Sequence, residues 1–189
     1  MLVETGKADV NARDSVGLAA LLLAADRGNA DVLKYLLETG LVDVNARGYR
    51  DHTPFSIAVF NEHREVMKLL LGTGKVEVDM PFNDGLIPLL WLAKCGFEDI
   101  IQLLVNDYRA DCNARAPTGD TALSIAASNG HVKAVEFLLD TGKFDVNSRN
   151  DFGDTALSLA SRNGHHDVVQ AFLDTGDFEA KEDSTSDQF

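Results

Sequence analysis

The stretch Gly142-Lys143-Phe144-Asp145-Val146-Asn147 ends in a tripeptide that returns every 34 residues along the chain. The other copies are Asp9-Val10-Asn11, Asp43-Val44-Asn45, Glu77-Val78-Asp79 and Asp111-Cys112-Asn113. A constant spacing is typical of proteins built from stacked units, because no single unit can bury its own apolar face. The spacing therefore predicts one continuous array of repeats.

Each tripeptide is followed by patterns that predict two helices. The first helix is predicted by a motif whose clearest copies read Gly-Asp-Thr-Ala-Leu, at residues 17–21, 51–55, 85–89, 119–123 and 153–157. The second helix is predicted by apolar residues at i, i+1, i+4 and i+5, as in Val32-Leu33-x-x-Leu36-Leu37. Each unit is therefore expected to be a pair of short helices.

Glycine separates the two predicted helices in every unit except the second. Gly28, Gly96, Gly130 and Gly164 share one position, where a helix commonly ends on a residue with positive φ. Glu62 takes this position in the second unit, so we expect about 1 kcal/mol of backbone strain there. Thr-Gly pairs predict the ends of the second helices, at residues 39–40, 73–74, 141–142 and 175–176.

These motifs together resemble the ankyrin repeat, whose pattern has a Thr-Pro-Leu-His-x-Ala helix start, a Gly-His step, a leucine-rich second helix and a Gly-x-Asp-Val-Asn loop. The resemblance covers nearly the whole chain, with one residue more per unit than the usual length of about 33. The Thr-Gly-Lys-x-Asp-Val-Asn motif is similar to the corresponding motif in ankyrin arrays of filamentous fungi. The resemblance implies an all-α solenoid of helix-turn-helix units joined by β-hairpin-like loops. A tetratricopeptide array has a similar period but lacks the Asp-Val-Asn loop.

The chain departs from the family pattern at the start of the first helices. Serine replaces the usual histidine at Ser56, Ser124 and Ser158, and leucine replaces it at Leu22 and Leu90. We therefore expect the hydrogen bonds that this histidine makes in the family to be rearranged here.

The repeat register divides the chain into three regions. Residues 1–13 are interpreted as the remnant of a preceding repeat with the first hairpin strand, because residues 1–4 align with the inside of a second helix. Five repeats are predicted over 14–176, at 14–47, 48–81, 82–115, 116–149 and 150–176. Residues 177–189 are interpreted as an acidic, disordered tail. The start inside a helix favours a fragment of a longer protein, with an irregular cap as the alternative.

Composition narrows the classes of function. A formal net charge of -13 and a pI near 4.6 argue against a nucleic-acid partner, because phosphate binding requires a basic surface. The sequence has no apolar run long enough to span a membrane and no signal peptide, so an intracellular protein, cytoplasmic or nuclear, is expected without a membrane partner. The two cysteines do not indicate a disulfide scaffold.

Residues that might indicate chemistry recur with the repeat, which indicates structural roles. His63, His131 and His165 share one position, but stacked helices lie about 8 to 10 Å apart, whereas zinc requires nitrogen ligands at about 2 Å. The Gly-Lys pairs lack the other residues of a phosphate-binding loop. Reactivity of Cys95 is a minor alternative. We therefore predict a protein that is not an enzyme and has no cofactor or metal.

Large aromatic residues occur at the predicted loop tips. Tyr49, Phe82 and Phe152 are candidates for partner binding, because aromatic side chains exposed on loops often anchor interfaces. The alternative is that they fold against a neighbouring tip. Phe60 and Trp91 are weaker candidates, and Trp91 is expected to pack because its position is apolar in every unit.

Arginine recurs on the predicted hairpin strand, at Arg13, Arg47, Arg115 and Arg149, with Pro81 interrupting the row. A row of guanidinium groups suits an acidic peptide, because arginine pairs with carboxylates through two hydrogen bonds. The alternative is that these arginines pair with acids of adjacent tips.

The sequence therefore favours a non-enzymatic scaffold that binds a partner protein or peptide through hairpin tips and a concave helical face. The alternative is a regulatory or sensing segment of a larger signalling protein or enzyme, whose catalytic domain lies outside this chain. The loop asparagines Asn11, Asn45, Asn113 and Asn147 also resemble positions that asparaginyl hydroxylases modify in such arrays. Their structural alternative is hydrogen bonding within the loop.

Overall fold

A computed structural model describes residues 9–14, 19–48, 51–82 and 84–176. Within these residues ten helices follow one another as five pairs, which we number as units one to five. The first helices of the units are α1 (Ala20–Asp26), α3 (Pro54–Phe60), α5 (Pro88–Cys95), α7 (Ala122–Ser128) and α9 (Ala156–Arg162). The second helices are α2 (Ala30–Glu38), α4 (Arg64–Leu71), α6 (Glu98–Asn106), α8 (Val132–Asp140) and α10 (His166–Thr175).

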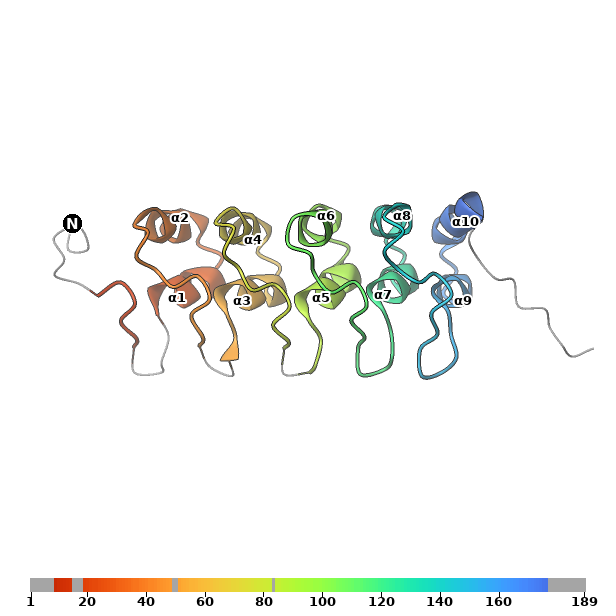
Figure 1. The fold of residues 1–189 in the computed structure, drawn as a ribbon, viewed down its shortest axis with the longest axis horizontal. Helices are drawn as coiled ribbons and strands as arrows, with labels where there is room; N and C mark the ends of the chain where they lie inside the picture. The colour runs from red at the N-terminus through yellow and green to blue at the C-terminus, as the bar shows by residue number, and fades with distance from the viewer. Residues whose placement is uncertain (1–8, 15–18, 49–50, 83, 177–189) are drawn as a thin grey trace, which may run out of the picture.

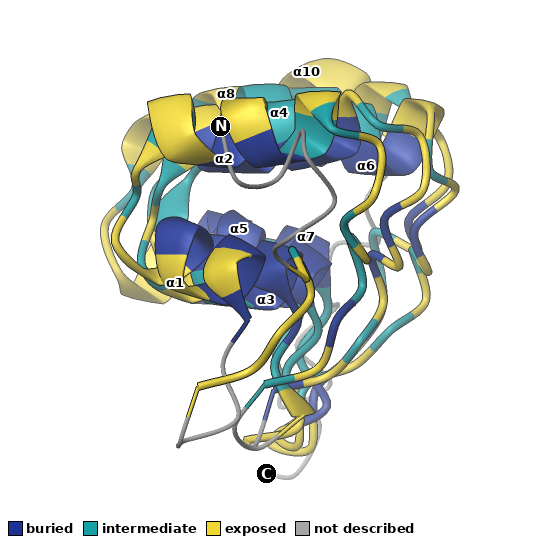
Figure 2. Ribbon diagram, turned by 90° about the vertical axis from the view of Figure 1, so that its left-hand side faces the viewer, coloured by how far each residue is buried: buried dark blue, intermediate teal, exposed yellow. Residues whose placement is uncertain are grey.

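The two sets of helices form two rows along the molecule, and the connecting loops extend from one side (Figure 1). Viewed along the array, the row of second helices is exposed on its outer side and the row of first helices is largely buried (Figure 2). Among the described residues, β-pairing is limited to an isolated antiparallel bridge between Arg13 and Ala19. The all-α solenoid predicted from the sequence is therefore confirmed.

The first helices of units two, four and five begin with the same hydrogen-bonded cap. In α3 the Thr53 side chain accepts from the Ser56 amide at 3.1 Å, and the Ser56 hydroxyl accepts from the Thr53 amide at 2.9 Å. Thr121 with Ser124 and Thr155 with Ser158 repeat this arrangement. A cap of this kind contributes about 1 kcal/mol to helix stability. The serines that replace the family histidine therefore complete capping boxes, which explains why they recur.

The turn between the two helices has positive φ in all five units. The four predicted glycines have φ between 65° and 76°, and Glu62 has φ 59°. A residue with a Cβ atom is strained in this conformation, by about 1 kcal/mol or more. The expectation of local strain at Glu62 is therefore consistent with its backbone.

The core lies between the two rows and continues through the array. Its largest fully buried side chains include Phe55, Met67, Ile100 and Phe172. Small residues on the first helices, such as Ala58 and Ala126, are also fully buried and permit close packing of successive units. Among the described residues, no helix is both long and apolar enough to cross a membrane.

Candidate partner-binding surface

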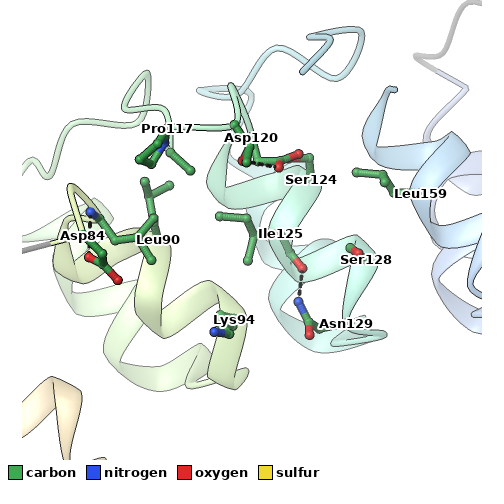
Figure 3. Close-up of a pocket in the computed structure, with 13 residues that line it drawn as sticks. Asp84, Leu90, Lys94, Pro117, Asp120, Ser124, Ile125, Ser128, Asn129 and Leu159 are labelled. Carbon is green, nitrogen blue, oxygen red and sulfur yellow. Dashed lines mark hydrogen bonds between the residues drawn. The ribbon is translucent and has the colours of Figure 1, made fainter. Parts of the chain in front are cut away.

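The exposed side of the first helices and the neighbouring loop tips together form a surface that we call the inner face. It contains a groove of about 420 Å³ between α5 and α7. Figure 3 shows Leu90 of α5 and Ile125 of α7 pointing into the space between the two helices, with Asp84, Pro117 and Asp120 from the loops beside them. The groove is also lined by Leu86, Lys94, Ala116, Thr118, Ser124, Ser128, Asn129 and Leu159. Both helices and loops therefore build it.

The loop wall of the groove is fixed by hydrogen bonds centred on Asp120. Its Oδ1 atom accepts from the Ser124 hydroxyl at 3.1 Å and from the side-chain Nδ2 of Asn150 in the next loop at 2.9 Å. Its Oδ2 atom accepts from the Thr118 hydroxyl at 2.7 Å. The Asp151 amide also donates to the Thr118 carbonyl at 3.0 Å, which joins the tips of units four and five. The wall is therefore held in place before any partner binds.

The three tip aromatics proposed from the sequence have different surroundings. Phe152 is 77% exposed at the tip of unit five, in agreement with the expected exposure. The exposure expected for Phe82 is wrong, because this side chain is only 6% exposed and packs against aromatic rings of unit two and α5. Tyr49 lies outside the described residues, so its role stays a prediction.

Phe82 belongs to an aromatic cluster between units two and three. Its ring centroid lies 5.7 Å from that of Trp91, 6.4 Å from that of Phe60 and 6.1 Å from that of His52. Trp91 packs as expected, and its buried Nε1 atom has no hydrogen-bond partner among the described residues. Phe60 is 53% exposed, and Lys94 Nζ lies 5.0 Å from the Trp91 ring centroid. The cluster therefore packs units two and three together and leaves the Phe60 side chain exposed to solvent.

The row of arginines is engaged with neighbouring groups. Arg13 donates to the carbonyl of Arg47 at 2.5 Å, and Arg115 donates to the carbonyl of Arg149 at 3.0 Å. Arg115 also donates to the Ser148 hydroxyl, and Arg149 donates to the Gly153 carbonyl at 2.9 Å. Arg47 lies 3.9 Å from the Glu77 carboxylate. Binding of an acidic peptide by this row stays a prediction, but Arg13, Arg47 and Arg115 already join successive loops.

Two loop asparagines also join successive units. Asn11 donates to the Leu41 carbonyl at 2.8 Å and accepts from the Asp43 amide at 3.1 Å. Asn45 repeats both bonds with the next loop, at 2.8 and 3.0 Å. Their hydroxylation stays a prediction.

The three recurring histidines link each unit to the unit before it. His63 Nε2 lies 3.1 Å from the carbonyl oxygen of Asp26, and His131 Nε2 lies 2.8 Å from that of Lys94. His165 Nε2 lies 3.0 Å from the carbonyl oxygen of Ser128. The described part of the chain contains no group of three or more metal-ligating side chains. The histidines therefore have a structural role that accounts for their recurrence.

The surroundings of the two cysteines disfavour ionisation of their thiol groups. Burial, together with the negative charge of Glu62 and a hydrogen bond to it, raises the pKa of Cys95 to about 11. Burial also raises the pKa of Cys112. Because a thiol reacts as its thiolate, both groups are poor nucleophiles at neutral pH.

Sequence reasoning did not identify Leu90, Ile125 and Asp120 as residues of one groove. Leu90 and Ile125 follow the apolar helical period, and that pattern does not distinguish a side chain in a groove from one in the core. Asp84 and Asp120 occupy corresponding loop regions, and only the fold brings them beside α5 and α7. The position of Asp84 and Asp120 near the predicted loop tips was the sequence feature that could have indicated a role in binding.

Comparison with known families agrees with this geometry. The family model described as ankyrin repeats (3 copies) matches the chain over residues 1–81, 50–116 and 89–183. The chain therefore belongs to the ankyrin repeat family, whose members are in general protein–protein interaction modules and typically lack catalytic activity. No curated protein matched the chain.

Proposed function

We propose that this chain is a non-enzymatic scaffold that binds a partner protein or peptide through its loop tips and the inner face. The observation that carries the proposal is the groove between α5 and α7, which is open to solvent and has fixed walls. Phe152 adds a large exposed aromatic ring on the loop of unit five, which follows the two units that build the groove. Aromatic residues and apolar pockets with polar rims are common at the centres of protein interfaces.

The recurring serines and histidines support the non-enzymatic part of the proposal through their structural roles. The hydroxyls of Ser56, Ser124 and Ser158 cap helices, and His63, His131 and His165 link successive units. A nucleophile and its base must lie within hydrogen-bonding reach of each other. These two sets instead make separate bonds to the backbone.

Site-specific cross-linking tests this function. A photoreactive phenylalanine analogue replaces Phe152 on the inner face and, as a matched control, Lys133 on the exposed outer side of α8. Irradiation in a lysate of cells that express the protein is expected to give a discrete adduct from position 152 and none from position 133. Equal labelling from both positions, or no adduct from position 152 or from an equivalent probe at Asn129, would contradict the proposal.

The tip aromatics provide a second test on the identified partner. Phe152→Ser is expected to weaken partner affinity by about tenfold, which is the usual effect of removing an interface anchor worth about 1.4 kcal/mol. Tyr49→Ser tests the remaining tip prediction in the same assay. Circular dichroism must first show that both variants keep the helicity of the wild type.

A further inference from the structure

We propose that the groove between α5 and α7 recognises a peptide segment in which an aliphatic residue is flanked by lysine or arginine. This inference rests on the proposed function and adds the chemistry of the partner. It follows from the apolar base of the groove and from the charges on its rim.

The base of the groove is aliphatic. Leu90 of α5 is 1% exposed and half-buried Ile125 of α7 lies beside it, while Leu159, which is 7% exposed, lines the groove from α9 on the far side of α7. Pro117 adds an apolar surface on the loop side (Figure 3). A volume of about 420 Å³ falls within the range of sites that enclose small ligands or individual side chains. An aliphatic side chain of a partner would occupy part of it and exclude water from these residues.

The rim of the groove and the adjoining tips are acidic. The described tip residues of units three to five are 82, 84–86, 116–120 and 150–154, and they contain Asp84, Asp120, Asp151 and Asp154 but no lysine or arginine. The net charge of the chain has the same sign. Acidic surfaces attract cationic partners and repel anionic ones.

Asp84 is the rim carboxylate best placed for a partner. Its Oδ1 atom accepts from the Leu86 amide at 3.1 Å, and its Oδ2 atom makes no hydrogen bond to a described residue. Asp120, by contrast, uses both oxygens within the protein. A lysine or arginine of the partner therefore has an available acceptor on the α5 side of the groove.

The nearby cations do not neutralise Asp84. Arg115 and Arg149 donate to backbone carbonyls, and Arg162 pairs with Asp154 at 2.8 Å. Lys94 lies over the Trp91 ring at the opposite end of the groove from the loop wall (Figure 3). Within the described residues Asp84 therefore has no ion-pair partner, which favours a basic flank on the bound segment.

Three short fluorescein-labelled peptides test this proposal on the full chain by fluorescence anisotropy. One carries leucine between lysines and arginines, the second replaces the leucine by serine, and the third replaces the basic residues by glutamate. The basic leucine peptide is expected to bind about tenfold more tightly than the serine peptide, and the acidic peptide is expected not to bind. Equal affinity of the leucine and serine peptides, or tighter binding of the acidic peptide, would overturn the proposal.

Variants locate the binding on the protein. Asp84→Asn is expected to weaken binding of the basic leucine peptide about threefold, a typical effect of one exposed charge pair, whereas Asp140→Asn on the outer row makes the same charge change without effect. Ile125→Ala is expected to weaken binding about tenfold. If this variant loses helicity, Pro117→Ala at an exposed loop position replaces it. Peptide binding that is unchanged in both groove variants would place the peptide elsewhere and overturn the proposal.

The two proposals fail in distinguishable ways. A cross-link from the inner face together with no binding of the basic leucine peptide would reject the partner chemistry and keep the scaffold function. Absence of any inner-face cross-link would reject the scaffold function, and with it the inference that rests on it.

Discussion

The junction between units two and three differs from the other junctions of the array. At those, a histidine ring lies directly over the glycine of the preceding turn, in the pairs Gly28 with His63, Gly96 with His131 and Gly130 with His165. A Cβ atom on these glycines would lie 2.5 to 2.7 Å from the histidine ring. At the junction of units two and three both partners differ, because Glu62 replaces the glycine and Phe97 replaces the histidine.

The difference indicates that the turn residue of one unit and the residue at the histidine position of the next unit depend on each other for packing. A glutamate Cβ atom occupies the space that the histidine ring needs, and phenylalanine has no nitrogen for the carbonyl bond. Side chains supply other contacts here: Arg64 lies 4.6 Å from the Phe97 ring centroid and donates to Asp99 at 2.8 Å. A short contact of a half-buried histidine has been replaced by a network of side chains near the surface.

The largest effect is expected from filling the space under a histidine. Gly130→Ala combines a φ of +75° with a Cβ atom 2.6 Å from the His165 ring, so we expect a loss of about 3 kcal/mol in the free energy of unfolding. Gly164→Ala is the matched control, because its φ is +76° and nothing lies within 4 Å of the new Cβ atom. Its expected loss is about 1 kcal/mol. Urea denaturation measures both, and equal losses would show that the contact with histidine has no energetic role.

A smaller effect is expected when the divergent junction is converted to the common form. Phe97→His alone should destabilise by about 1 kcal/mol, because the Glu62 Cβ atom obstructs the ring. In a Glu62→Gly background the same change should become neutral or stabilising. A double-mutant cycle in urea is therefore expected to give a coupling of about 1 to 2 kcal/mol. Additive effects of the two changes would show that positions 62 and 97 do not depend on each other for packing.

The loop of unit three provides the next test, because Asp79 stands where Asn11 and Asn45 join successive loops. Asp79 Oδ1 accepts from the Asp111 amide at 3.3 Å, but an ionised carboxylate has no donor to replace the asparagine NH₂ group. Asp79→Asn is therefore expected to stabilise the array by about 0.5 kcal/mol at pH 7.

The pH dependence of this gain follows from the carboxyl group. Partial burial raises the pKa of Asp79, with a further contribution from the charge of Asp111, despite a backbone hydrogen bond that lowers it. A pKa raised in the folded state stabilises folding at low pH, and this contribution is lost as the pH rises through the folded-state value. The stability advantage of the asparagine variant should therefore grow as the pH rises from the ordinary pKa of aspartate through the raised folded-state pKa of Asp79. A constant difference between the two proteins in denaturation from pH 3 to pH 7 would contradict this reasoning.

The smallest effect is expected for the surface network of the divergent junction. Asp99→Asn removes pairs with Arg64 at 2.8 Å and Lys68 at 2.7 Å, both partly exposed, so we expect a loss below about 0.5 kcal/mol at pH 7. Burial acts to raise the pKa of Asp99, but the hydrogen bond from Lys68 and the two positive charges lower it on balance.

A lowered pKa gives a contribution that is present above the unfolded-state value and is lost as the pH falls through the folded-state value. Wild type and Asp99→Asn should therefore converge at acid pH and in 1 M salt, where the screening length is about 3 Å. Thermal denaturation under these conditions measures the convergence. A difference that persists in high salt would indicate packing rather than charge.

The sequence predicted the fold because the same period governs helices, turns and caps. The positive φ at Gly130 and the helical stripe of α8 follow from local patterns. The burial of Phe82 was not predictable in this way, because it depends on rings at Phe60 and Trp91 from other elements. The pairing of Gly28, Gly96 and Gly130 with a histidine one unit later was also missed, since the register aligns equivalent positions and does not show which different positions touch.

The links between units have a direction. The recurring histidines reach back to a carbonyl of the preceding unit, whereas Asn11, Asn45, Arg13 and Arg115 reach forward to the backbone of the next loop. The two sides of a unit therefore carry unlike sets of donors and acceptors, and these bonds form only in head-to-tail stacking. Such an array is polar in the way that a filament is polar, and a unit inserted in reverse would match neither neighbour.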